Sequence, residues 1–71
     1  MDDHWFSQWL RREMEDQELT RKQLAEKSGI SIATIGYYLN AERLPTLFTF
    51  GALVNALGKR IEIIDDRKTR G

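Results

Sequence analysis

The side chains that could take part in chemistry are few in this 71-residue chain, and their types favour binding over catalysis. His4 is the only histidine and cysteine is absent, so the sequence offers no thiol nucleophile and no Cys/His metal site. It also has no glycine-rich phosphate loop. We expect His4 to be solvated and Ser7 to be an exposed helix residue. The sequence therefore predicts no catalytic residue, no metal ligand and no cofactor, and hence no enzyme.

Basic side chains, by contrast, surround the middle of the chain. Eleven Lys and Arg residues balance eleven Asp and Glu residues, so the net charge is zero. The acids are concentrated in the first quarter of the chain, whereas Arg21, Lys22, Lys27 and Arg43 flank residues 31–40. A neutral protein with this distribution can still present one basic face to nucleic acid. The alternative is an evenly mixed, solvated surface.

Two short helical patterns in the range Leu19–Leu39 position the residues of this central region. Thr20 can cap the first helix, with Gln23 three residues later as in a capping box. Gly29 then supplies the left-handed conformation that a tight turn needs. Ser31 can cap the second helix. Two such helices joined by a glycine turn form a helix-turn-helix, a motif whose second helix lies in the major groove of DNA.

Two further helices make the chain all-α. We expect helices over residues 5–17, between Thr20 and Ser28, over 32–40 and over 47–57. Asn40 is the expected left-handed residue after the third helix, because Asn tolerates that conformation better than Ala41. Thr46 can cap the fourth helix and Gly58 ends it.

The predicted core takes apolar positions from all four helices and from the turn. It comprises Phe6, Leu10, Leu24, Ile30, Ile35, Tyr38, Leu53 and Leu57, and the buried face of the fourth helix also includes Leu47, Phe50 and Val54. Trp5 and Trp9 form a second stripe, which exceeds what so small a domain requires. They either extend the core against the C-terminal segment or belong to a partner or dimer surface, where Trp is favoured.

After Gly58 the pattern changes to that of one short β-strand, Arg60–Asp65. Ile61 and Ile63 share one face and Ile64 lies on the other. A single strand in a helical chain has no internal partner, and the simplest partner is the same strand of a second copy, antiparallel across a two-fold axis. The expected dimer interface is Arg60, Ile61, Glu62, Ile63 and Ile64. The alternative is an extended coil that lies over the core.

These predictions divide the chain into a helix-turn-helix domain (residues 1–58), a dimerisation strand (59–66) and a flexible tail (67–71). The sequence contains no apolar run long enough to cross a membrane and no signal-peptide pattern. We therefore expect a cytoplasmic protein with no membrane partner.

The helical part of the chain resembles the repressor-like helix-turn-helix domains of phage Cro and C1 proteins, the XRE family. The resemblance rests on Leu19-Thr20, Gln23-Leu24-Ala25, Gly29-Ile30-Ser31, Ile35, Pro45-Thr46-Leu47 and Ala56-Leu57-Gly58, in one register without a gap from about Leu10 to Gly58. It implies a four-helix repressor that binds double-stranded DNA at a palindromic operator as a homodimer.

The resemblance also implies which residues contact DNA. Thr20 and Arg21 match positions that meet phosphate, and Asn40 and Arg43 match the loop that meets the DNA backbone. The outward recognition positions are Ser31, Ile32, Ala33, Thr34, Gly36 and Tyr37.

Several of these recognition residues depart from the Gln, Arg and Asn of many relatives. Ile32 and Ala33 can read thymine methyl groups. Gly36 implies either a very close approach of the groove or weak specificity. Tyr37 offers a hydroxyl to a base or phosphate, or else is a partly buried aromatic beside Tyr38.

A second departure concerns an ion pair that some relatives form between the first and third helices. Met14 and Leu39 occupy those two positions here. Because a matched apolar pair can replace a buried ion pair without loss of stability, we predict direct contact between Met14 and Leu39.

A repressor-like domain followed directly by one strand also resembles the HipB-type antitoxins of bacterial toxin–antitoxin operons. That narrower resemblance implies an autorepressor with a toxin protein as its second partner. The alternatives are a phage-type regulator, and a protein-binding module on a repressor-like fold with little DNA affinity. The neutral charge and the apolar recognition helix favour the module, whereas the helix caps and flanking basic residues oppose it.

Overall fold

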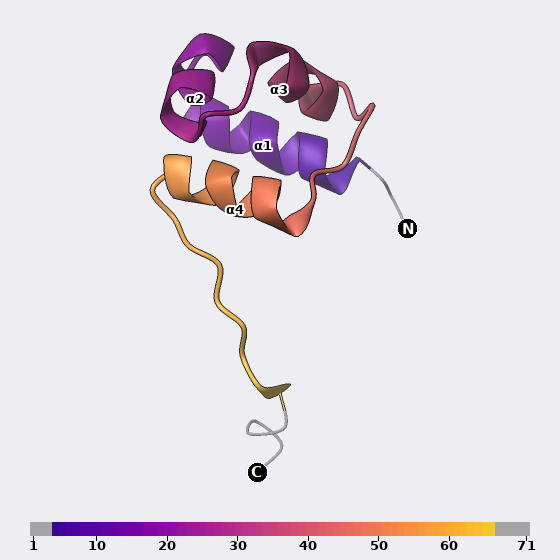
Figure 1. Ribbon diagram of the computed structural model, residues 1–71, viewed down its shortest axis with the longest axis vertical. Helices are drawn as coiled ribbons and strands as arrows, with labels where there is room; N and C mark the ends of the chain where they lie inside the picture. The colour runs from indigo at the N-terminus through magenta and orange to yellow at the C-terminus, as the bar shows by residue number, and fades with distance from the viewer. Residues whose placement is uncertain (1–3, 67–71) are drawn as a thin grey trace.

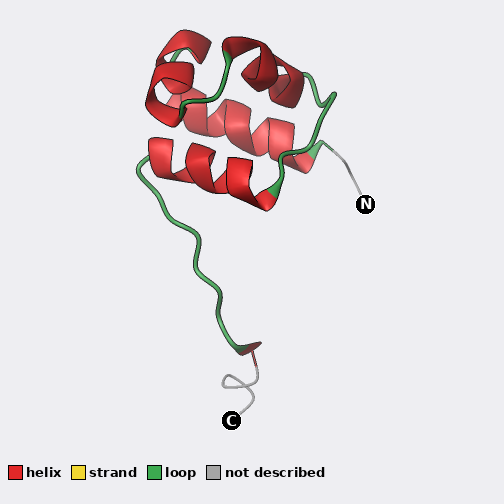
Figure 2. Ribbon diagram, viewed as in Figure 1, coloured by secondary structure: helices red, strands yellow, loops and turns green. Residues whose placement is uncertain are grey.

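The computed structural model describes residues 4–66, which form four helices and no strand (Figure 1, Figure 2). The helices are α1 (Trp5–Asp16), α2 (Arg21–Ser28), α3 (Ile32–Leu39) and α4 (Leu47–Ala56). In Figure 1, α1 runs between the α2–α3 pair above it and α4 below it. The predicted four-helix, repressor-like fold is therefore confirmed. The expected tail, residues 67–71, lies outside the described residues.

One apolar core joins the four helices. Its buried residues are Phe6, Leu10, Met14, Leu24, Ile35, Tyr38, Leu39, Leu53 and Leu57. Ile30, in the turn before α3, is only partly buried and packs against this cluster. Seven of the eight predicted core residues are therefore buried, because the apolar periodicity of each helix places one face against its neighbours.

Two burial predictions were wrong. Leu47 was expected in the core, yet 76% of its surface is exposed, because it lies in the first turn of α4 before the buried face of that helix begins. Ser7 was expected in solvent but is buried. Its hydroxyl donates to the carbonyl of His4 at 2.9 Å, so the buried polar group is satisfied at the amino end of α1.

The amino ends of the last three helices are capped as the sequence predicts. Thr20 and Gln23 form a complete capping box, in which Oγ1 of Thr20 accepts from the Gln23 amide at 3.1 Å and Oε1 of Gln23 accepts from the Thr20 amide at 2.8 Å. Ser31 caps α3 and Thr46 caps α4 in the same way, each accepting from the amide three residues later. These bonds fix where α2 and α3 begin.

The carboxyl end of α3 differs from the prediction. The left-handed residue is Ala41, with φ of 60°, whereas Asn40 has φ of −89°. The Ala41 amide donates to Tyr38 O and the Glu42 amide donates to Tyr37 O, the bond pair of a Schellman motif. In this motif the left-handed position follows the capping residue, and Asn40 is the capping residue because its amide still bonds Gly36 O.

The two tryptophans pack against α4. The ring centroid of Trp9 lies 5.5 Å from that of Phe50, and the Trp5 centroid lies 6.4 Å from it. Trp9 packs on the core, while half of the Trp5 surface is exposed. Their aromatic partners are thus in α1 and α4 rather than in the C-terminal segment.

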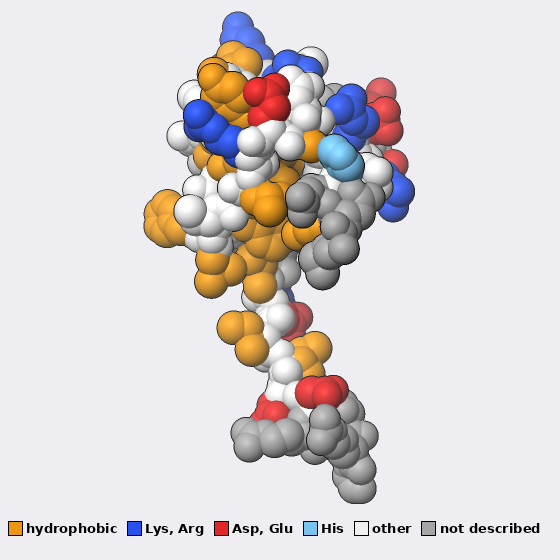
Figure 3. All heavy atoms as spheres, turned by 90° about the vertical axis from the view of Figure 1, so that its right-hand side faces the viewer, with side chains coloured by type: hydrophobic (Ala, Val, Ile, Leu, Met, Phe, Trp, Pro, Cys, Tyr) orange, Lys and Arg blue, Asp and Glu red, His pale blue; other side chains and the backbone are white. Residues whose placement is uncertain are grey.

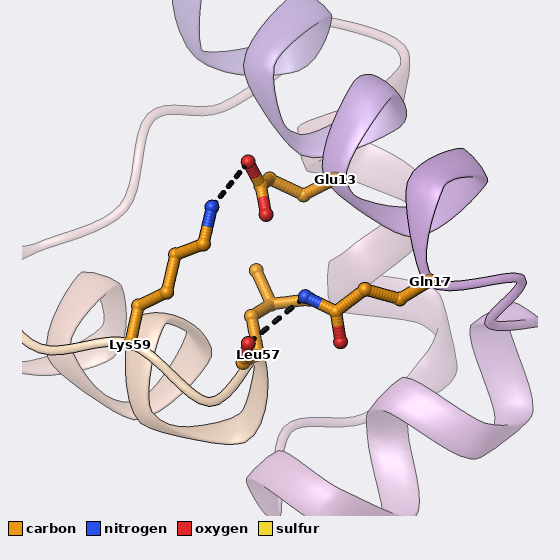
Figure 4. Close-up of polar contacts among 4 residues, drawn as sticks. All are labelled: Glu13, Gln17, Leu57 and Lys59. Carbon is orange, nitrogen blue, oxygen red and sulfur yellow. Dashed lines mark hydrogen bonds and ion pairs between the residues drawn. The ribbon is translucent and has the colours of Figure 1, made fainter.

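Residues 59–66, here called the C-terminal arm, leave the four-helix body at the carboxyl end of α4. Two contacts hold this exit (Figure 4): Nζ of Lys59 lies 2.7 Å from Oε2 of Glu13 in α1, and Nε2 of Gln17, the residue after α1, donates to Leu57 O at 2.9 Å. The arm then runs away from the body as coil (Figure 1), and 96% of the Ile63 surface is exposed. It does not lie over the core. Pairing with a second copy stays a prediction, because a strand is defined only by its partner.

Candidate nucleic-acid interface

The helix-turn-helix is built by α2, a tight turn and α3. Gly29 adopts φ of 77° and ends α2, as the left-handed turn requires. On α3, the buried side chains that face the core are Ile35, Tyr38 and Leu39. The opposite side of α3 therefore lies at the surface.

The predicted contact residues all lie on this surface or beside it. Those that are exposed are Thr20, Arg21, Ser31, Ile32, Ala33, Tyr37, Asn40 and Arg43, while Thr34 and Gly36 are half-buried. The structure thus brings together residues from the start of α2, the outer face of α3 and the loop that follows it.

Some of these polar groups are already engaged within the protein. The hydroxyl of Ser31 accepts from the Thr34 amide at 3.1 Å, and the two hydroxyl oxygens lie 2.8 Å apart. The side-chain Nδ2 of Asn40 donates to Oε1 of Glu42 at 3.4 Å. These bonds orient the side chains at both ends of α3.

Arg21 reaches from α2 to the face of α3. A Cβ placed on Gly36 would lie 3.5 Å from Nη1 of Arg21. The guanidinium group therefore rests where a longer side chain at position 36 would project. This contact gives Gly36 a local role that the sequence did not reveal.

Arg43 and Tyr37 form a second pair at the far end of α3. The guanidinium carbon of Arg43 lies 4.2 Å above the centre of the Tyr37 ring. This cation–π contact holds Tyr37 at the surface, with 37% of its area exposed. Contact of the Tyr37 hydroxyl with DNA stays a prediction, and so does the alternative of a partly buried aromatic beside Tyr38.

The interface holds several basic groups that can meet phosphate. Within residues 4–66, the side chains of Arg21, Lys22 and Lys27 make no hydrogen bond or ion pair, and all three are exposed. They can therefore neutralise an anion without first breaking an internal contact. Among the described residues, there is no group of His, Cys, Asp and Glu side chains that could hold a metal ion.

Arg11 is a residue that sequence reasoning missed. From α1, its Nη2 donates to the carbonyl of Leu39 at 2.9 Å, in the last turn of α3. A cation at this end also suits the helix dipole. Met14 and Leu39, predicted to touch, are both in the buried core and line the same surface hollow of about 350 Å³. The apolar pair thus lies beside an Arg–carbonyl bond that fixes α3 on α1.

The comparison with protein families agrees with this arrangement. Residues 10–64 match the family described as Helix-turn-helix. The match covers α2, α3, α4 and all of α1 except its start. The chain therefore belongs to this family of Cro/C1-type, or XRE-type, domains, and it is a DNA-binding transcription regulator by that membership. No curated protein and no solved structure matches the chain significantly. None of the helices described in residues 4–66 is long and apolar enough to cross a membrane.

Proposed function

We propose that the protein is a cytoplasmic, homodimeric repressor, without enzymatic activity, that binds a palindromic operator by placing α3 in the major groove. The observation that carries this proposal is the outer face of α3, which is exposed and carries the guanidinium of Arg21 at Gly36 and that of Arg43 at Tyr37. Such a face combines the two requirements of operator recognition, because phosphate contacts supply affinity and groove contacts supply specificity.

The residues divide between these two tasks. Thr20, Arg21 and the first backbone amides of α2 face phosphate, as a helix amino terminus does well. Asn40 and Arg43 meet the backbone from the loop. The groove-reading residues are Ser31, Ile32, Ala33, Thr34, Gly36 and Tyr37, of which Ile32 and Ala33 suit thymine methyl groups.

The proposed homodimer uses the C-terminal arm. Pairing of Arg60, Ile61, Glu62, Ile63 and Ile64 with the same residues of a second copy would satisfy the arm backbone and cover its isoleucines. The two-fold axis also gives the paired recognition helices that a palindrome requires, about one helical turn of DNA apart.

The arm is also what supports a role as the antitoxin and autorepressor of a toxin–antitoxin operon, with a toxin as the second protein partner. A phage-type regulator is the alternative. An adjacent, overlapping toxin gene would favour the antitoxin.

A different observation supports a protein-binding module. Ile32, the first residue of α3, exposes 48% of its surface, and the chain has no net charge. A module of this kind would use α3 to contact a protein and would bind DNA weakly.

A duplex-selection experiment followed by a salt titration tests the proposal. The parent protein should enrich a palindromic duplex from a random library, and its affinity should fall steeply as salt rises. Arg21→Ala should lower the salt slope by about one unit on any duplex, since one phosphate contact is lost. Arg12→Ala, an exposed α1 residue away from the interface, is the control. If no sequence is enriched and binding is insensitive to salt, the protein-binding module is the better account.

A further inference from the structure

The outer face of α4 carries large apolar side chains that the domain does not cover. Leu47 is 76% exposed, Phe48 is 88% exposed and Leu44, in the preceding loop, is 56% exposed. Beside them lies an apolar groove of about 380 Å³ lined by Trp5, Leu44, Pro45, Thr46, Leu47 and Phe50. Figure 3 shows hydrophobic side chains gathered over the lower part of the body, close to where the C-terminal arm descends.

Gly51, in the middle of α4, gives a second and independent indication. Glycine inside a helix costs about 1 kcal/mol relative to Ala. A Cβ added at Gly51 would meet no atom within 4 Å, and its φ is not positive, so neither crowding nor backbone conformation within the domain requires glycine. Gly51 is half-buried, one turn after the exposed Leu47, and a small residue at such a position allows another helix to approach closely.

The C-terminal arm places further apolar surface on the same side of the molecule. It descends beneath α4, on the side opposite α2 and α3 (Figure 1). Ile61, Ile63 and Ile64 are 43%, 96% and 76% exposed. The face at the amino half of α4 and the arm, which leaves at the carboxyl end of that helix, are thus two uncovered apolar surfaces of one chain.

We propose that the face formed by Leu44, Leu47, Phe48 and Gly51 binds a second copy of this chain, with the two α4 helices antiparallel across the two-fold axis. This inference rests on the proposed homodimer and says which helix face it buries. In that arrangement the carboxyl end of one α4 lies beside the amino end of the other. Each arm then starts next to the partner's apolar groove.

The dimensions allow the arms to meet at the same axis. The ten residues of α4 span about 15 Å, and the six residues from Arg60 to Asp65 span about 20 Å when extended. Arms that start at opposite ends of the α4 pair can therefore cross the axis in antiparallel directions. A stable interface buries roughly 800 Å² per partner, and Leu47, Phe48, Ile63 and Ile64, each at least 76% exposed, can supply a large part of that area.

Sedimentation of the full chain, over a range of concentrations, tests the inference. Phe48→Glu should raise the dimer dissociation constant roughly 100-fold, because each dimer would bury two charges in an apolar contact. Gln8→Glu adds the same charge to an exposed position of α1 and should leave the constant unchanged.

Gly51→Ala should change monomer stability and dimer affinity in opposite directions. It should raise the unfolding temperature measured at low concentration, where monomer prevails, because Ala favours the helix. It should nevertheless weaken the dimer, and Gly51→Leu should weaken it further, since both fill the space of closest approach.

The outcomes separate this inference from the homodimer itself. A dimeric parent whose dissociation constant is unaffected by Phe48→Glu and Gly51→Leu overturns the α4 face and leaves the arm as the interface. A parent that is monomeric at high micromolar concentration overturns both, and would point to a different protein as the occupant of this face.

Discussion

At the scale of single residues, two arginines connect α3 to its neighbours in different ways. Arg21 crosses from α2 and rests over Gly36, on the surface that would meet DNA. Arg11 reaches from α1 and donates to the last turn of α3, at the edge of the core. We expect Arg21 to matter for binding and Arg11 for stability, because only Arg11 has an internal hydrogen-bond partner among the described residues.

Gly36→Leu should weaken operator binding by displacing the Arg21 guanidinium. The loss should equal that of Arg21→Ala, and Gly36→Leu should add nothing when Arg21 is already replaced by Ala. A double-mutant cycle measured by fluorescence anisotropy tests this coupling. Gly36→Ala is the matched control, since its Cβ would make only ordinary contact at 3.5 Å. If the full loss persists in the Arg21→Ala background, the leucine side chain introduced at position 36 collides with DNA directly and the coupling is wrong.

Arg11→Ala should lower the free energy of unfolding by about 1 kcal/mol, through loss of the hydrogen bond to Leu39 O. Urea denaturation measures this change. Arg12→Ala, at an exposed neighbouring position, should change stability by less than about 0.5 kcal/mol. Equal effects of the two substitutions would mean that the Arg11 bond contributes nothing.

At the scale of elements, the carboxyl ends of the helices differ in how well their residue types suit the backbone conformation. Three helices finish with a left-handed residue after the cap: Glu18 follows α1, Ala41 follows α3 and Gly58 follows α4. Only Gly58 has the residue type that this conformation favours. The ends of α1 and α3 therefore hold backbone strain that the surrounding helices must offset.

Ala41→Gly should raise the free energy of unfolding by about 0.5–1 kcal/mol. Removing Cβ relieves a left-handed cost of roughly 1–2 kcal/mol, and the greater freedom of Gly in the unfolded chain cancels part of the gain. Thermal or urea denaturation measures the difference. Ala52→Gly, inside α4, should act in the opposite direction by about 1 kcal/mol. A destabilised Ala41→Gly protein would contradict the left-handed assignment.

At the scale of the whole molecule, the C-terminal arm and the four-helix body have different surfaces. The body buries its apolar residues between helices, whereas the arm and the amino half of α4 leave theirs exposed. So much exposed apolar surface is unusual for a small monomer and is typical of an interface. Dimerisation is the simplest way to cover it and to supply two recognition helices.

Ile63→Pro should convert the dimer to monomer, because proline removes a backbone donor from the proposed strand pair. The monomer should be less stable and should lose most of its operator affinity, since a half-site contact is weak alone. Analytical ultracentrifugation at micromolar concentration, with anisotropy on the selected duplex, measures both effects. Ile63→Val keeps the donor and the β-branched shape and should behave as the parent does. A Pro variant that still dimerises would show that the arms are not paired.

The sequence by itself determined the helix-turn-helix and most of the core. The capping box of Thr20 and Gln23, the Ser31 cap and the left-handed Gly29 act between residues at most four apart in the chain, so their geometry can be read locally. The inward residues follow the helical period, which holds wherever a helix lies. The outward residues on α3 follow from the same period, although their binding to DNA is a separate property.

Only the tertiary structure decided the features that depend on where one helix lies against another. Arg11 meets Leu39 O across 28 residues and Lys59 meets Glu13 across 46, and no periodicity links such positions. Ala41 takes the left-handed conformation in place of the better-suited Asn40, because α3 ends where Leu39 reaches the core and residue preference is the weaker effect. Leu47 is exposed for a related reason. Its place in the helical pattern suits burial, but the α1 rings pack on Phe50 in the first turn of α4 and leave 76% of the Leu47 surface exposed.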